Sequence, residues 1–304
     1  MTDVASAFDT AIGITGPIRR PRQMLADQSY GGHASLHDEG TAGGLGLSGA
    51  PIEGPTHFSQ FDPLAFAAWG KRWFETGCIS AHFRTMVIEG EEVTASLVDS
   101  DHASGRIDAV KPDGSQVLTG TASVDPAAKT ELGERLARLG DPGDLFVMDR
   151  LAVGQRSAEP VVASVDHDTP NGELYPFSLA QKLEAITEPS PWYSSADNPW
   201  GRPILPFEMI SVLAQKTPTD FAVRGPAIGL FLDLEVRLEG SPVFVGQDYR
   251  LDREVVGLGQ SRRTESCWVR TTLTDVDTGA LAATVLLHSG VFKESYAGYP
   301  ADRL

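Results

Sequence analysis

The stretch His37-Asp38-Glu39 places an imidazole beside two carboxylates. The unperturbed pKa of an imidazole is about 6.5, so a small shift poises it as a general base at neutral pH. Hydration or elimination beside a carbonyl needs such a base, a proton source, and hydrogen-bond donors for the carbonyl oxygen. We predict catalytic roles for all three residues, with Asp38 or Glu39 orienting His37. The alternative is a solvated helix start beside a glycine-rich loop.

Glu53 and His57 flank the start of a long apolar segment. A carboxylate and an imidazole four positions apart could both face a pocket, so we add them to the predicted catalytic residues. His57 could instead cap the preceding loop.

Four further side chains are predicted to bind a substrate. His82 and Arg84 stand two apart on a predicted strand and therefore share a face, which could line a pocket or form an exterior ladder. Tyr193 is a polar candidate in the second half. Glu208 lies in an apolar helix, where burial would raise its pKa, although a surface position near the helix N-terminus would suit a carboxylate equally.

Two apolar segments, 58–75 and 206–216, have the pattern of helices. Shorter helices are predicted at 126–145 and Phe177–Ile186. Strand-like runs follow the first long helix at Ile79–Val87, Val93–Val98, Arg106–Val110 and Gln116–Val124. In the second half we predict a strand pair in Leu151–Val165 and strands at Ile228–Leu238, Asp248–Val256, Glu265–Thr274 and Ala280–Ser289. Hairpin-linked strands after one helix, twice, indicate an α+β fold with antiparallel sheets.

The two halves share an order of features. Gly49-Ala50-Pro51-Ile52 precedes the first apolar segment, and Gly201-Arg202-Pro203-Ile204 precedes the second, about half the chain length away. This order favours a duplication and two fused units about a pseudo-two-fold axis. We predict an N-terminal extension at 1–29, a first unit at 30–126, a linker at 127–147, a second unit at 148–293 and a tail at 294–304.

The composition limits the partners. A formal net charge of −16 argues against binding nucleic acid or an anionic membrane surface, but a local basic patch could still hold an anionic ligand such as coenzyme A. No signal peptide or membrane-spanning run is visible, so we expect a cytoplasmic protein. The sequence is compatible with a homodimer.

Cofactor and metal signals are missing from the sequence. Cys78 and Cys267 are the two cysteines, and we expect both to be buried and unpaired. No zinc-ligand cluster and no phosphate-binding glycine motif occurs, so we predict no metal and no cofactor.

The G-x-P-I step, the buried helix and a turn of the type Pro242-Val243-Phe244-Val245-Gly246 resemble the hotdog fold. More narrowly, residues 30–125 and 150–292 resemble the double-hotdog, MaoC-like hydratases and dehydratases. The resemblance implies an antiparallel sheet wrapping a central helix in each unit, with the two sheets side by side. It implies a cofactor-independent lyase that acts on an α,β-unsaturated or β-hydroxy acyl compound. The acyl group could be attached to coenzyme A, to a carrier protein or to neither.

The family pattern is kept unevenly. His37 stands at the position of the family histidine, whereas Gly32 replaces the family aspartate. In the second half Tyr193 and Pro189 stand at these positions. The family's glycine-paired histidine after P-I is absent from both halves, where Glu53-Gly54 and Pro206-Phe207 stand instead. We therefore expect one working pocket around His37, Glu53 and His57. The alternatives are a thioesterase- or isomerase-type hotdog enzyme and a non-catalytic protein that binds a hydrophobic ligand or stabilises a partner.

Overall fold

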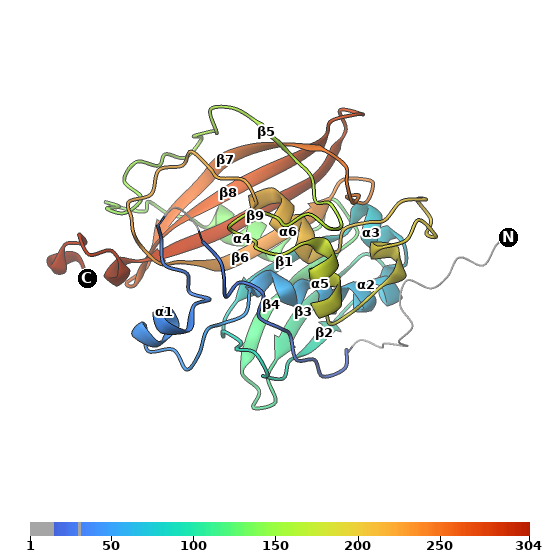
Figure 1. Ribbon diagram of the computed structural model, residues 1–304, viewed down its shortest axis with the longest axis horizontal. Helices are drawn as coiled ribbons and strands as arrows, with labels where there is room; N and C mark the ends of the chain where they lie inside the picture. Colours follow the sequence, from blue (N-terminus) through green and yellow to red (C-terminus); the bar gives the residue numbers. More distant parts are fainter. Residues whose placement is uncertain (1–14, 30–31) are drawn as a thin grey trace.

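The computed structural model describes residues 15–29 and 32–304. The strands in these ranges form one sheet in the order β2-β3-β4-β1-β6-β9-β8-β7-β5, and every pairing is antiparallel (Figure 1). The first half supplies β1 (Cys78–Phe83), β2 (Thr94–Val98), β3 (Ser104–Val110) and β4 (Gln116–Ser123). The second half supplies β5 (Val161–Ala163), β6 (Gly229–Leu238), β7 (Tyr249–Gln260), β8 (Thr264–Asp275) and β9 (Leu281–Phe292). The predicted α+β class with antiparallel strands is confirmed.

The two halves of the sheet meet where β1 pairs with β6, with Ile79 opposite Val236. Each strand belongs to a different half of the chain, so the backbone hydrogen bonds run without a break from one half to the other. The predicted side-by-side joining of two sheets is therefore present. The predicted boundaries between the units stay a prediction, and residues 1–14 of the extension and 30–31 of the first unit lie outside the described residues.

The first long helix is built in three pieces: η1 (Gly54–Phe61), α2 (Asp62–Trp69) and α3 (Arg72–Thr76). The expectation of one helix over 58–75 is wrong in this respect. Gly70 ends α2 with a φ of 62°, a left-handed conformation that other residues adopt at a cost, so the chain turns before α3 begins. The second long helix, α6 (Phe207–Gln215), lies within its predicted range.

The helices α2, α5 (Leu179–Ala185) and α6 lie together over one face of the sheet (Figure 1). Their apolar side chains form one core with those of both halves of the sheet. Trp73 of α3 stacks on Phe207 of α6, with ring centroids 4.4 Å apart. Burial of this shared apolar surface holds the two halves together.

The opposite face carries α4 (Glu131–Ala137), which is shorter than the helix expected in 126–145. Its Leu132 is buried against Trp268 and Leu286, and the backbone N–H of Leu132 donates to Ser80 Oγ at 3.0 Å. The remaining helical turns are α1 (Glu39–Gly44), η2 (Pro191–Tyr193), η3 (Lys293–Ser295) and η4 (Ala301–Arg303).

The strand pair expected in Leu151–Val165 is not formed. Only β5 and an isolated bridge between Arg156 and Glu254 pair with the sheet in this stretch. Pro160 cannot donate a ladder hydrogen bond, and Gly154 turns the chain with a φ of 87°. Cys78 and Cys267 are buried and unpaired, as expected. In the described ranges, each helix is too short or too polar to cross a lipid bilayer.

Candidate functional site

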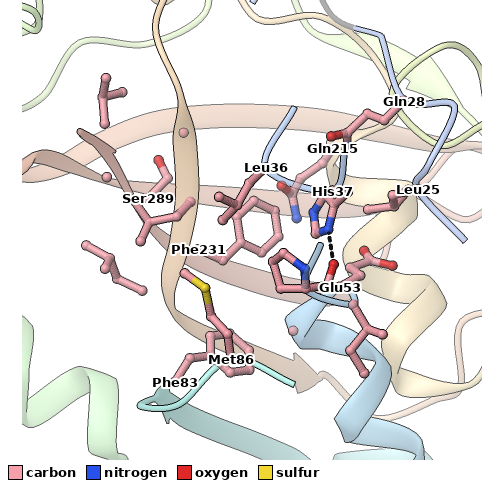
Figure 2. A pocket seen from close by; sticks show the side chains of 18 of the residues that line it. Leu25, Gln28, Leu36, His37, Glu53, Phe83, Met86, Gln215, Phe231 and Ser289 are labelled. Atoms are coloured by element: carbon pink, nitrogen blue, oxygen red, sulfur yellow. Dashed lines mark hydrogen bonds between the residues drawn. The ribbon is translucent and has the colours of Figure 1, made fainter. Parts of the chain in front are cut away.

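A cavity of ≈ 360 Å³ lies between the two halves of the molecule. Its walls are mainly apolar and include Leu36, Phe83, Met86, Leu230, Phe231 and Val291. Its polar side chains include Gln28, His37, Glu53, His57 and Gln215. Figure 2 shows His37, Glu53, Gln28 and Gln215 on one side of the view and Phe83, Met86, Phe231 and Ser289 on the other. His37, Glu53, Gln28 and Gln215 form a polar end, and the opposite wall is mainly apolar, which suits a ligand with one polar group and a hydrocarbon part.

His37 is held at the polar end by the backbone. Its Nδ1 lies 2.7 Å from the carbonyl oxygen of Pro51 (Figure 2). A carbonyl oxygen can only accept, so Nδ1 carries the proton and Nε2 bears the lone pair. Burial lowers the pKa of His37, and the Pro51 hydrogen bond opposes this only in part. The ring therefore stays neutral around neutral pH and can accept a proton at Nε2.

Asp38 and Glu39 are exposed and lie outside the cavity lining. Asp38 caps α1 by accepting from the backbone N–H of Thr41 at 2.7 Å. Glu39 accepts from the backbone N–H of Ala50 at 3.2 Å. The expectation that one of them orients His37 is wrong, because the helix start turns both carboxylates away and Pro51 supplies the orienting oxygen instead.

Glu53 lines the cavity and is buried. Burial raises the pKa of its carboxyl, while the ammonium of Lys182, 3.8 Å from Oε2, opposes the rise. Its Oε1 has no hydrogen-bond partner among the described residues. A buried polar atom without a partner is costly, and at a cavity wall it marks a place where a ligand can bind.

Gly54 follows at the first position of η1 and also lines the cavity. Its N–H stands at the helix N-terminus, where backbone donors have no partner within the helix. A Cβ at this position would lie 3.1 Å from the ring of Phe83. Glycine thus permits close packing of Phe83 at the cavity wall.

His57 is buried on the same helical segment and lines the cavity, as expected. Its Nδ1 is 3.4 Å from Nε2 of Gln60. Burial and the nearby charge of Lys182 lower the pKa of His57 to about 4. His57 is therefore a neutral imidazole at neutral pH.

Glu208 is buried and lies outside the cavity lining, so its predicted contact with a substrate is not made at this wall. Its carboxylate Oε2 lies 3.2 Å from Nζ of Lys182. Burial raises the pKa of Glu208 to about 7, against the effect of that ammonium.

Sequence reasoning missed Lys182. The residue lies on α5, and its side chain is buried on the same helix face as Leu179 and Ile186. A lysine at an apolar-face position of a helix is a signal that could have identified it, because burying an unpaired ammonium is costly.

Tyr193 also lies outside the cavity lining. Its hydroxyl donates to Asp62 Oδ2 at 2.8 Å, and Trp73 Nε1 donates to Asp62 Oδ1 at 2.9 Å. The backbone N–H of Phe207, the first residue of α6, bonds to the same carboxyl. The carboxyl group of Asp62 thus occupies the space at the N-terminus of α6. The predicted contact of Tyr193 with a substrate is not made in this cavity.

His82 faces α4 rather than the cavity. Its Nδ1 donates to Asp233 Oδ1 at 2.7 Å. Arg84 is exposed and contributes to the lining just after β1 ends, and its Nε donates to Thr119 Oγ1 at 3.3 Å. Since Thr119 lies opposite His82 in the sheet, the exterior-ladder alternative describes His82. Arg84 lines the cavity, as its predicted place in a pocket requires. In the described part of the chain, no group of three His, Cys, Asp or Glu side chains could hold a metal ion.

No family model matches the chain, and no curated protein matches it. Two solved structures share its fold. One, from Chloroflexus aurantiacus, is named for a MaoC domain dehydratase; it is 16% identical, with a TM-score of 0.56, over 96% of this chain and 99% of that one. The other, from Mycobacterium tuberculosis, is described as having a double hotdog fold; it is 13% identical, with a TM-score of 0.56, over 91% of this chain and 96% of that one. A structure named for a thioesterase II from Thermobifida fusca is similar with a TM-score of 0.40 and 16% identity, over 81% and 88%.

Proposed function

We propose that the protein is a hydratase or dehydratase of acyl compounds, a function that its double-hotdog fold, similar to that of a MaoC domain dehydratase, supports. The reaction would add water to, or remove it from, an α,β-unsaturated or β-hydroxy carbonyl compound. The observation that supports this proposal most is that His37 and Glu53 line the same mainly apolar cavity. His37 offers a lone pair at Nε2, and Oε1 of Glu53 has no hydrogen-bond partner among the described residues.

In the dehydration direction, His37 Nε2 removes the proton from the carbon next to the carbonyl. The electrons of that C–H bond form the carbon–carbon double bond as the bond from the β-carbon to oxygen breaks. Glu53, protonated, gives its proton to the leaving oxygen, which departs as water. The raised pKa of Glu53 favours the protonated form that this step needs.

Negative charge develops on the carbonyl oxygen when the α-proton leaves. We infer that the N–H of Gly54, at the N-terminus of η1, stabilises this charge, because helix N-termini favour anions and a fixed donor needs no reorganisation. The apolar walls would take the hydrocarbon part of the acyl group. The carrier could be coenzyme A, a carrier protein or neither.

The test uses N-acetylcysteamine thioesters of trans-2-enoic acids of about four to ten carbons, a range suited to a pocket of this size. Loss of the enoyl absorbance measures hydration. We expect His37→Ala to lower turnover by roughly 10²–10⁴-fold, the usual contribution of general acid–base catalysis. Glu53→Gln should fall in the same range, because a carboxamide cannot give up a proton at neutral pH.

Matched controls are His167→Ala and Glu134→Gln, which change an exposed imidazole and an exposed carboxylate away from the cavity. Both should retain full turnover, and circular dichroism should show all four variants folded. Full activity in folded His37→Ala would contradict the proposal.

Thioester hydrolysis is the second candidate, because His37 Nε2 could equally take a proton from a water that attacks the thioester carbonyl. Release of free thiol from the same substrates, without loss of the double bond, would identify it. Binding of the thioesters without either change would favour a ligand-binding protein.

A further inference from the structure

Glu53 belongs to a buried group of ionisable side chains behind the cavity wall. Lys182 Nζ lies 3.8 Å from Glu53 Oε2 and 3.2 Å from Glu208 Oε2, and it donates to Thr56 Oγ1 at 3.0 Å. The exposed fractions of Glu53, Lys182 and Glu208 are 4%, 2% and 1%. The three residues come from the start of η1, from α5 and from α6, so the group joins both halves of the molecule.

The charges in this group do not balance if both carboxyls are ionised. Two carboxylates and one ammonium leave one negative charge buried, which is strongly disfavoured. Both oxygens of Glu208 and Oε1 of Glu53 have no hydrogen-bond partner in the described ranges, so no backbone donor compensates for that charge. The group therefore retains one proton, shared between two carboxyls.

The positions of the two carboxyls determine which of them can donate the shared proton to a ligand in the cavity. Lys182 is closer to Glu208 than to Glu53, and of the two carboxyls Glu53 is the one that lines the cavity. The ammonium therefore stabilises the ionised form of Glu208 more than that of Glu53. Burial nevertheless raises the pKa of Glu208 to about 7, so near neutral pH the two carboxyls exchange one proton, and Glu53 is the carboxyl that can pass it into the cavity.

We propose that Lys182 and Glu208 are positioning residues that hold a proton on Glu53 and so make it the acid of the reaction. This rests on the proposed function. Neither residue touches the substrate. Glu208 keeps Lys182 from ionising Glu53, and Lys182 prevents both carboxyls from being protonated at once.

Other ionisable groups surround the set. These are His57 on η1, Tyr175 in the loop before α5, Asp62 at the start of α2, and Lys111, whose ammonium already pairs with Glu91. His57 is neutral at neutral pH, and burial raises the pKa of Tyr175 well above its usual value. Lys182 is therefore the cation in contact with both carboxyls.

The test changes one charge at a time and measures the pH at which Glu53 ionises. In Glu208→Gln, Lys182 is left with Glu53 alone, so Glu53 should ionise at a pH lower by about one unit or more. In Lys182→Met, Glu53 loses its cation and should ionise at higher pH. Glu134→Gln, on the exposed face of α4, serves as the control and should leave this pH unchanged.

Two measurements report that pH. The first is the infrared carbonyl band of a protonated carboxyl, followed against pH and assigned by its loss in Glu53→Gln. The second is the alkaline limb of kcat/KM with the enoyl thioesters. Opposite shifts in the two variants are expected. A role confined to packing would lower stability without moving either reading, and unchanged readings in folded Glu208→Gln would overturn the inference.

The two proposals can fail separately. The infrared titration needs no turnover, so shifts in the band without any reaction of the thioesters would reject the proposed function and keep the shared proton. Turnover that depends on His37 with an unmoved Glu53 band would do the reverse. If Lys182→Met does not fold, Glu208→Gln decides the question, because the substitution is nearly isosteric.

Discussion

His37 and Glu53 must be in opposite protonation states for the proposed reaction, and their surroundings shift their pKa values in the required directions. Burial lowers the pKa of His37 and raises that of Glu53. His37 loses its lone pair as the pH falls through its lowered pKa, and Glu53 loses its proton as the pH rises through its raised pKa. We expect a bell-shaped kcat/KM profile, with the acid limb below the ordinary value for histidine. An acid limb that persists in His37→Gln would contradict this assignment.

Tyr193 differs from His37 because its hydroxyl is committed to Asp62. Tyr193→Phe removes that donor and leaves a buried carboxyl oxygen with fewer partners, at a cost of about 1–3 kcal/mol in the free energy of unfolding. Urea denaturation would measure the loss. Turnover should fall far less than in His37→Ala, since the cavity wall is untouched. A loss of turnover as large as that of His37→Ala, in a Tyr193→Phe variant that is still folded, would show that Tyr193 acts on the substrate.

At the scale of elements, Asp62 fixes the start of α6 against the first helical segment. Trp73, Tyr193 and the backbone N–H of Phe207 all bond to this one carboxyl. Asp62→Ala would leave three buried donors without their acceptor, so we expect a loss of at least about 3 kcal/mol in the free energy of unfolding.

Asp62→Asn provides the matched comparison. Burial raises the pKa of Asp62 to about 7, so a neutral side chain of the same shape approximates a form that the site already accommodates near neutral pH. Its destabilisation, measured in the same urea titration, should be clearly smaller than that of Asp62→Ala. Equal losses would mean that the shape of the carboxyl group contributes nothing.

At the scale of the whole molecule, Asp233 ties the seam between the two halves. His82 on β1 and His288 on β9 both donate to it from either side of β6, and Arg135 of α4 lies 3.2 Å away. Burial opposes ionisation, but the two histidines lower the pKa of Asp233 to about 2.

A lowered carboxyl pKa makes stability depend on pH in one direction. The stabilisation is complete above the ordinary pKa of about 3.8 and is lost as the pH falls toward 2. Asp233→Asn should therefore be less stable than the wild type at pH values above about 4 and should lose less of its stability on acidification. Urea denaturation at several pH values would measure this, and parallel curves for the two proteins would contradict it.

Sequence patterns predicted the antiparallel strands, both long helical segments and four of the residues that line the cavity: His37, Glu53, His57 and Arg84. These features depend on local patterns: strand alternation, helical spacing, and a His37, Glu53 and His57 set that flanks one G-x-P-I step. Residues close in sequence around one helix start have few ways to lie far apart.

The remaining features depend on contacts between segments that are far apart in the sequence. Asp38 and Glu39 lie at the start of α1 and face away from the cavity. The hydroxyl of Tyr193 donates to Asp62. Helix α5 places Lys182 between Glu53 and Glu208. The break at Gly70 and the missing strands before β5 depend on single backbone positions within otherwise regular patterns. Which side chains share a buried space depends on contacts between distant segments. A buried charge or polar group needs a partner, and that partner can come from any segment of the folded chain. A local sequence pattern therefore does not identify it.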